Sequence, residues 1–376
     1  MEHLISHWRT ERPYVPVLKT KLGEANALKK LDPGVRRRVL PLLDFLPPPT
    51  SEYSPIALVN RISKAASNFA RSLDGCPAVY VDTYDIPPAC KGPSGRQAIE
   101  PVCESCLSHG MSVIPIVGLG RTLEHTVAVS KLPFLQKSGV GVRLEVEDLL
   151  NSSIVVARLE NTLGRLQLDT PIVDLIFDLR SLVGQSEARL SALVSVALVD
   201  VARLGPFRST TICGSNYPVD VSEIPKDGQA IVERRELAIW RRVVAAVGTV
   251  RMPRFGDYAV VHPDFVELGP VPNANAKIRY AFGDHWIVRR GHSLRESPNY
   301  EQYRDLSRDV ADGPYFHGAN CSYGDQYIAD CAAGRVGTGN LGTWVSVDVN
   351  HHITATTELI VAEVQRSVAG IENQPL

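Results

Sequence analysis

The sequence predicts an α/β fold, namely a (β/α)8 barrel of the TIM type with a C-terminal α+β extension. Eight short, nearly continuous apolar runs recur in the first 265 residues, as expected for strands of a parallel sheet buried on both faces. Amphipathic helical patterns separate these runs, which indicates βαβ units with right-handed crossovers. Most of the runs also end in a charged residue, at the position where barrels carry their functional groups.

The eight expected strands follow one another at the spacing of β/α units. They are YVPVLK (14–19), RVLPLLD (38–44), AVYVD (78–82), MSVIPIV (111–117), GVRLE (141–145), IVDLIFDLR (172–180), STTICGS (209–215) and DYAVVHP (257–263).

Helical patterns lie between them and carry one apolar face. The clearest are GEANALKKL (23–31), SEARLSALVSVALVDVARL (186–204) and VERRELAIWRRVVAAV (232–247). A doubly wound open sheet is the main alternative. That fold usually has a glycine-rich phosphate turn after its first strand, and VLKTKLGE (17–24) has a single glycine. The barrel is therefore the preferred prediction.

The pattern changes near residue 265, which predicts a barrel over 1–265 and an extension packed on it over 266–376. NANAKIRYAFGDHWIVRRGHS (273–293) is typical of two strands joined by a turn at 282–285. A charged helix (297–312), a glycine-rich stretch (332–344) and a closing helix (356–368) are expected to follow.

Composition limits the classes of partner. The chain of 376 residues has 40 basic and 41 acidic side chains, a net charge of −1. No global field would therefore draw it to nucleic acid or to an anionic membrane, and any anion site must be local. The apolar runs are too short to span a membrane, and the N-terminus lacks the apolar core of a signal peptide. Seven cysteines, an odd number, suit a reducing compartment. We expect a cytoplasmic protein that does not bind membranes.

Several stretches resemble the phage-type beta protein family of bacteria and phages. They are YVPVLKTKLGEANAL (14–28) with RVLPLLD after it, AKIRYAFGDHWIVRRG (276–291), FHGANCSYGDQYIAD (316–330) and GTWVSVDVNHHIT (342–354). The resemblance touches both ends of the chain, while the middle matches mainly in its β/α rhythm. It implies a phage–host setting such as defence, by analogy alone, and brings no catalytic signature.

Charged residues end nearly every expected strand, and in a barrel these ends meet at one mouth. The candidates are Lys19, Lys21, Asp44, Asp82, Asp85, Arg143, Glu145, Asp178, Arg180, Ser215, Tyr217, His262 and Asp264. In KTK, RLE and DLR the two charges are two residues apart, so both side chains of a strand would point to the same face. They can form a polar ligand pocket, or a purely structural network of ion pairs.

If these residues form a ligand pocket, they can be assigned roles in it. The catalytic candidates are Lys19, Lys21, Asp82, Glu145 and Asp178, and the ligand-binding candidates are Lys19, Lys21, Arg143, Arg180, Gly214, Ser215 and Tyr217. The stretch CGSNYP (213–218) follows the seventh strand, where backbone N–H groups often bind phosphate, although it can equally be an ordinary tight turn.

No cofactor or metal is predicted, although three weaker readings stay open. Lys19 with Gly214 and Ser215 is the minimum for a pyridoxal phosphate site. The cysteines of CESC (103–106) have half of a zinc spacing, and core or surface positions on a helix fit them better. His351 and His352, taken as part of a strand, would point to opposite faces and could not easily share a metal.

Three functions follow from these observations. The leading hypothesis is a barrel whose polar mouth binds an anionic, phosphorylated or nucleic-acid-related ligand. The second is a non-catalytic module of a phage defence system that binds a partner protein through the C-terminal extension. The third is a metal-dependent hydrolase of phosphoesters or nucleic acid that uses Asp82, Glu145 and Asp178. Basic and aromatic residues on the hairpin (280–292) allow nucleic-acid contact, or form a solvated face. The sequence does not decide whether the protein is an enzyme.

Overall fold

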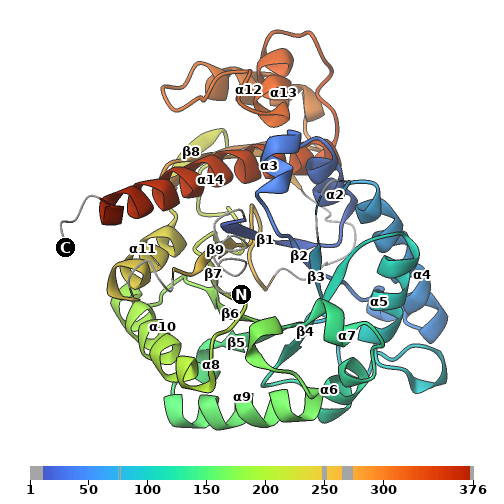
Figure 1. Ribbon diagram of the computed structural model, residues 1–376. Helices are drawn as coiled ribbons and strands as arrows, with labels where there is room; N and C mark the ends of the chain where they lie inside the picture. The colour runs from blue at the N-terminus through green and yellow to red at the C-terminus, as the bar shows by residue number, and fades with distance from the viewer. Residues whose placement is uncertain (1–11, 75, 77, 248–251, 265–273, 373–376) are drawn as a thin grey trace.

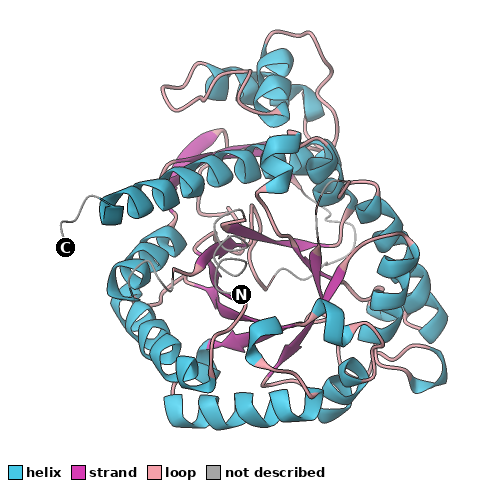
Figure 2. Ribbon diagram, viewed as in Figure 1, coloured by secondary structure: helices cyan, strands magenta, loops and turns pink. Residues whose placement is uncertain are grey.

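The computed structural model describes residues 12–74, 76, 78–247, 252–264 and 274–372. Eight parallel strands close into a barrel in the order β1-β2-β3-β4-β5-β6-β7-β9, with helices outside them (Figures 1 and 2). The strands are β1 (Tyr14–Lys19), β2 (Leu42–Asp44), β3 (Val79–Asp82), β4 (Val113–Gly118), β5 (Val140–Glu145), β6 (Val173–Ser181), β7 (Ser209–Ser215) and β9 (Arg254–Asp257). The predicted fold class is confirmed.

The outer ring follows the chain. Its helices are α2 (Leu22–Lys29), α3 (Pro33–Arg37), α4 (Pro55–Ala70), α5 (Ile99–Ser108), α6 (Leu123–Ser130), α7 (Leu135–Ser138), α8 (Val146–Leu149), α9 (Ser152–Leu166), α10 (Glu187–Val201) and α11 (Arg235–Val247). Side chains at Ser54, Thr122, Asn151 and Ser186 accept hydrogen bonds from backbone N–H groups at the starts of α4, α6, α9 and α10. These caps fix where each helix begins, just beyond the mouth.

The eighth barrel strand differs from its prediction. β9 covers Arg254–Asp257, whereas the strand was predicted over 257–263, of which only Asp257 is in β9 and 258–263 form the loop after it. Backbone pairing explains this, because Phe255, Gly256 and Asp257 align with both β7 and β1, and the pairing ends there. His262 and Asp264 therefore lie in the loop beyond the strand.

The barrel interior is layered. Tyr80, Asp174 and Arg254 lie near its lower end, where the Tyr80 hydroxyl donates to Asp174 Oδ2 at 2.8 Å and Arg254 Nη1 donates to Tyr80 Oη at 3.3 Å. A middle layer is apolar and consists of Val15, Val17, Leu42, Ile114, Ile116, Ile176 and Cys213. Gly141 belongs to this layer, because a Cβ there would come within 2.3 Å of Ile116 Cδ1. The apolar layer separates the polar lower end from the charged mouth.

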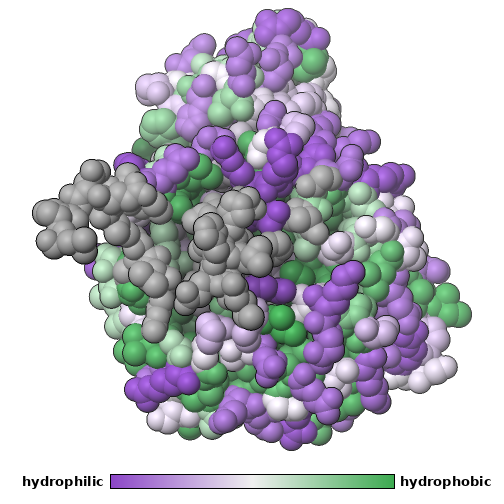
Figure 3. Space-filling model, in the orientation of Figure 1, coloured by the Kyte–Doolittle hydropathy of each residue, from purple (hydrophilic) through white to green (hydrophobic). Residues whose placement is uncertain are grey.

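The C-terminal part adds a three-stranded antiparallel sheet and three helices. β10 (Asn275–Phe282) and β11 (His285–Ser293) form the predicted hairpin, with Gly283 at φ +52° in its turn. β11 also pairs with β8 (Gly228–Glu233), a strand that the sequence analysis missed at the start of a helical pattern. The helices α12 (Gln302–Ala311) and α13 (Tyr323–Ala332) project from one side of the barrel, and polar side chains predominate there (Figures 1 and 3).

The last helix, α14 (Leu341–Glu372), lies between α11 and α2 in the ring (Figure 1). His351 and His352 lie on this helix and not on a strand, so the expected geometry for the two histidines is wrong. His352 Nε2 lies 2.8 Å from Asp257 Oδ2, and the Tyr14 hydroxyl donates to Asp257 Oδ1 at 2.6 Å. Both ends of the chain therefore meet at the last strand of the barrel.

A buried charge network supports this junction. Arg234, at the start of α11, lies 3.2 Å from Asp257 Oδ2 and donates to Thr356 Oγ1 at 2.9 Å. Its Nε is 3.6 Å from Glu236 Oε1. Burial raises the pKa of Glu236 to about 7, although Arg234 opposes the shift. The junction thus contains a carboxyl group, that of Glu236, which ionises only at a higher pH than an ordinary glutamate.

Candidate functional site

Arg143 forms the centre of the barrel mouth. It lies near the carboxyl end of β5, two residues before the last residue of that strand, and is 2% exposed. Its Nη1 donates to Asp44 Oδ1 at 2.9 Å and to Asp82 Oδ2 at 2.6 Å, and its Nε donates to Asp178 Oδ2 at 2.8 Å. One guanidinium therefore serves carboxylates from β2, β3 and β6. This arrangement depends on the barrel, because parallel strands bring their carboxyl ends to one rim.

Lys19 adds a second cation to the mouth. Its Nζ lies 3.0 Å from Asp44 Oδ2 and 2.6 Å from Asp85 Oδ2. Asp44 is thereby bound on both oxygens, by Lys19 and by Arg143. Lys19 meets a carboxylate from the neighbouring strand because β2 pairs with β1 in register at Lys19 and Asp44.

Lys19, Asp44, Asp85 and Arg143 form an inner layer of the mouth. Their opposite charges favour the ionised forms of Lys19, Asp44 and Arg143. Burial alone would raise the pKa of Asp44, but Arg143 and Lys19 outweigh it and hold that pKa well below its usual range. Burial would likewise lower the pKa of Lys19, and Asp44 with Asp85 reverse the direction. For Asp85, burial and the Asp44 charge raise the pKa. The inner layer is thus a compensated network in which Asp85 holds a proton more strongly than an ordinary aspartate.

An outer layer surrounds Tyr84, which follows β3. Three guanidinium carbons lie over its ring, those of Arg180 at 4.3 Å, Arg143 at 4.7 Å and Arg121 at 5.2 Å from the centroid. Such contacts are attractive because the ring face is electron-rich. The Tyr84 hydroxyl donates to Glu145 Oε2 at 3.1 Å, and burial raises the pKa of Glu145, with Asp178 adding to the shift.

Arg180 is held in an uncommon backbone conformation. Its φ is +53°, a left-handed value, at a register shift between Asp178 and Ser181 in the pairing of β6 with β7. The Arg180 N–H donates to Asp178 Oδ1 at 3.0 Å, which fixes the bulge. Ala259, in the loop after β9, has φ +48°. Non-glycine residues in this region cost about 1–3 kcal/mol each and cluster at functional sites.

Arg180 is also less enclosed than Lys19 and Arg143, since 15% of its side chain is exposed and only 1% of each of theirs. Its Nη2 lies 2.5 Å from Asp264 Oδ1, and the Asp264 side chain is 59% exposed. Its Nη1 donates to the Tyr258 hydroxyl at 3.2 Å. Tyr258 in turn donates to Asp178 Oδ2 at 2.5 Å, so the two layers are connected.

The remaining predicted ligand-binding residues lie at the ends of β1 and β7 or just after them. Lys21 is not in the strand, because β1 ends at Lys19 and Lys21 is the N-cap residue of α2. Ser215 Oγ accepts a hydrogen bond from the Tyr217 N–H at 3.1 Å. A Cβ on Gly214 would lie against Leu182, and the Tyr217 ring packs edge-on against Trp286.

The loop after β7 is consequently a poor cradle for phosphate. The Asn216 N–H donates to Glu236 Oε2 at 3.1 Å, and the Tyr217 N–H is used by Ser215. Both amides that such a site would need already have acceptors. The pairing of Lys19 with two carboxylates likewise disfavours a Schiff base with pyridoxal phosphate.

Several residues of the mouth were not predicted, among them three that follow strands. Tyr84, Arg121 and Tyr258 lie in or at the start of loops, beyond the strand ends on which the prediction was based. Arg121 Nη2 lies 2.7 Å from Asp82 Oδ1. Tyr258 directly follows Asp257, the last residue of the eighth barrel strand. It was missed because that strand was predicted over 257–263, which placed Tyr258 inside the strand and not just after it.

The carboxylates do not form a typical metal cluster. Asp44, Asp82 and Asp178 each contact Arg143, and Glu145 accepts from Tyr84. Hard cations need carboxylate oxygens that are not already neutralised by a guanidinium. In the described ranges, no group of three or more His, Cys, Asp or Glu side chains is placed to hold a metal ion. Cys103 and Cys106 are buried on α5, and burial raises the pKa of the Cys106 thiol to about 12.

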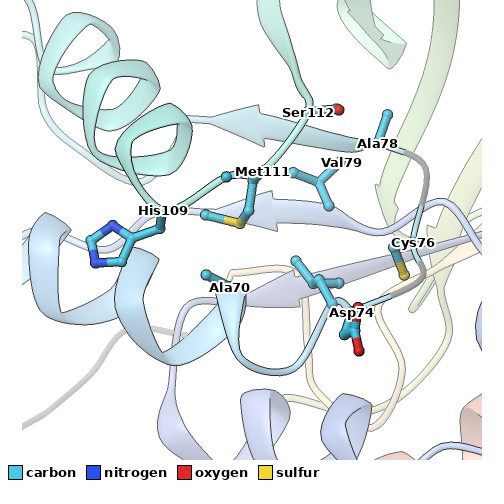
Figure 4. Close-up of a pocket in the computed structure, with 10 residues that line it drawn as sticks. Ala70, Asp74, Cys76, Ala78, Val79, His109, Met111 and Ser112 are labelled. Atoms are coloured by element: carbon cyan, nitrogen blue, oxygen red, sulfur yellow. The ribbon is translucent and has the colours of Figure 1, made fainter.

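The hairpin and a cavity at the far end of the barrel are two further places where a ligand could be expected. Trp286 and Tyr280 are buried, so neither ring is open to a nucleobase, and Arg289 is paired with Asp309. A cavity of about 350 Å³ lies at the opposite end of the barrel from the mouth, before β3 and β4. Figure 4 shows Met111 and His109 beside it. Residues at this end of a barrel usually serve stability.

Comparison with known proteins agrees with the resemblance in the sequence. The chain is 22% identical over 357 residues to "Protein beta" of Enterobacteria phage P4, and the alignment covers 92% of this chain and 93% of the phage protein. None of the described helices is long and apolar enough to cross a membrane. The family model described as Beta protein matches residues 14–357. The chain therefore belongs to the Beta protein family.

Proposed function

We propose that the barrel mouth binds an anionic, phosphate-bearing ligand, and that Arg180 is the group that recognises it. The ion pair between Arg180 and Asp264 carries this proposal. Asp264 is 59% exposed, and exposed ion pairs contribute only about 0–1 kcal/mol. A phosphate oxygen can therefore replace the Asp264 carboxylate at little cost.

The inner layer supports the same assignment. Lys19 and Arg143 are committed to buried carboxylates, and removing either cation from them would be costly. Arg180 is only half-buried, and its planar guanidinium suits the two oxygens of a phosphate. The left-handed backbone at Arg180 is a further argument, since such strain is retained where it positions a functional group.

Calorimetric titration with inorganic phosphate and pyrophosphate tests the proposal. Arg180→Gln is expected to lose the heat of binding that the wild-type protein gives. Arg203→Gln is the matched control, because the Arg203 side chain is 75% exposed and paired with Asp200 on a different part of the barrel. Absence of binding to the wild type, or equal binding to Arg180→Gln, would refute this function.

A protein-interaction role is the second candidate. It is favoured by the projection of α12 and α13 away from the barrel (Figure 1), and by the phage origin of the relative, which suits a phage–host conflict. Pull-down with the full chain and with a variant carrying charge reversals on α12 distinguishes it from ligand binding at the mouth.

A further inference from the structure

A serine and a histidine lie side by side at the mouth, next to Arg180. Ser181 is the last residue of β6, and His262 lies in the loop after β9. His262 Nε2 is 2.9 Å from Ser181 Oγ. This separation is within the range of a nucleophile and its general base, and the ends of barrel strands are where such groups act.

We propose that Ser181 and His262 form a nucleophile–base pair that cleaves an ester of the anionic molecule held by Arg180. The inference rests on the proposed function, because the anion bound by Arg180 would be part of the substrate. The serine is half-buried and accessible, while the imidazole is 5% exposed and so held in place.

Asp264 connects the anion to the histidine. In the present arrangement the Asp264 N–H donates to His262 Nδ1 at 3.1 Å, so Nε2 carries the ring proton and faces Ser181. The Asp264 carboxylate lies 3.9 Å from Nδ1 but is paired with Arg180. When a substrate anion takes Arg180, this carboxylate is released, and the ring proton can move from Nε2 to Nδ1, where the Asp264 carboxylate accepts its hydrogen bond in place of the contact with the Asp264 N–H. Nε2 is then unprotonated and free to act as a base.

The reaction balances with water as the only co-reactant. The Ser181 oxygen bonds to the ester carbonyl carbon while its proton moves to Nε2. The bond from that carbon to the alcohol oxygen breaks, and the alcohol leaves with the proton from Nε2. Water then attacks the acyl-serine with His262 again as base, and releases the acid.

A serine-directed fluorophosphonate tests the pair without needing the natural substrate. In this reaction the Ser181 oxygen bonds to phosphorus, fluoride leaves, and the proton passes to His262. Peptide mass spectrometry should find the adduct on Ser181. Ser181→Ala should abolish it, and His262→Gln should slow labelling about 100-fold or more. Ser130→Ala, on α6 away from the mouth, is the control and should be labelled like the wild type.

The pH profile distinguishes a base from a structural histidine. The groups acting on His262 are Asp264, Arg180 and Lys19, and burial dominates, lowering the pKa of His262. Labelling should therefore be constant from high pH down to the usual histidine value of about 6.5, and fall only below it. Asp264→Asn, a positioning variant, should lower the constant rate while its melting temperature is unchanged.

The possible results separate this inference from the proposed function. No adduct on Ser181 of the folded wild type, or equal labelling of His262→Gln, would overturn the pair even if phosphate binds. Adduct formation with the predicted variant effects, in a protein that binds no phosphate, would support the pair and reject Arg180 as the anion site.

Discussion

Replacing Lys19 with methionine is the sharpest test of the mouth as a compensated network. Lys19→Met keeps the length of the side chain and removes the ammonium group that lies between Asp44 and Asp85. Asp44 keeps Arg143, whereas Asp85 loses the ammonium group that pairs with it. The cost therefore comes mainly from one stranded carboxylate.

The structure limits how much stability Lys19→Met can lose. Removing one partner of a buried pair costs about 3–5 kcal/mol. The Asp85 side chain is 17% exposed and its pKa is already raised, so it can take up a proton instead of staying charged. We expect a loss near the lower limit, about 3 kcal/mol at pH 7. The loss should shrink toward pH 4, where Asp85 of the variant becomes neutral.

Urea unfolding followed by tryptophan fluorescence measures this loss. Lys21→Met is the matched control, because Lys21 is half-buried at the start of α2, and a change below about 1 kcal/mol is expected. Adding Asp85→Asn to Lys19→Met should recover stability, since the stranded charge is gone. A loss in Lys19→Met below that of Lys21→Met, or no recovery in the double variant, would show that the reasoning is wrong.

Two further predictions concern stability. Burial raises the pKa of Glu236 from 4.5 to about 7, so the folded state binds more protons than the unfolded state between these values, and stability falls as pH rises through them. Glu236→Gln removes this penalty, and its stability relative to the wild type should rise by about 3 kcal/mol from pH 4.5 to pH 8; an equal difference at both pH values would contradict the shift. Gly141→Ala places a methyl group 2.3 Å from Ile116 Cδ1, and the overpacked barrel should lose about 1–3 kcal/mol in urea unfolding. Gly164 lies on α9 with no atom near its Cβ position, so Gly164→Ala should not lower the stability of the protein. A similar loss of stability in both variants would argue against tight packing inside the barrel.

The sequence predicted the barrel well because its strands are buried on both faces and stand out as apolar runs. The errors at β9 and β8 have physical causes. β9 has only one strongly apolar residue, Phe255, since Arg254 and Asp257 belong to polar clusters and Gly256 makes room inside. β8 alternates between half-buried and exposed residues, so its pattern merges with that of the helix that follows.

The candidate site was predictable only in part. The rule that parallel strands end together placed Lys19, Asp44, Asp82, Arg143 and Asp178 at one mouth, and their contacts confirm it. The same rule could not find Arg121 or Tyr84, because loop conformation decides where these side chains point. It also could not reveal that Ser181 meets His262, since that contact depends on the bulge at Arg180 and on the displaced end of β9.

The position of α14 has a consequence for how the protein is made. The helix that lies against β1 and α2 is the last of the chain, and β10, β11, α12 and α13 must be synthesised before it. Domains tend to fold as units while the chain emerges. Here the first strand, its helix and the Tyr14–Asp257 pair stay without their cover until α14 has been synthesised and can pack on them. A nascent chain halted before α14 should therefore hold an open, protease-sensitive barrel, whatever the ligand at its mouth.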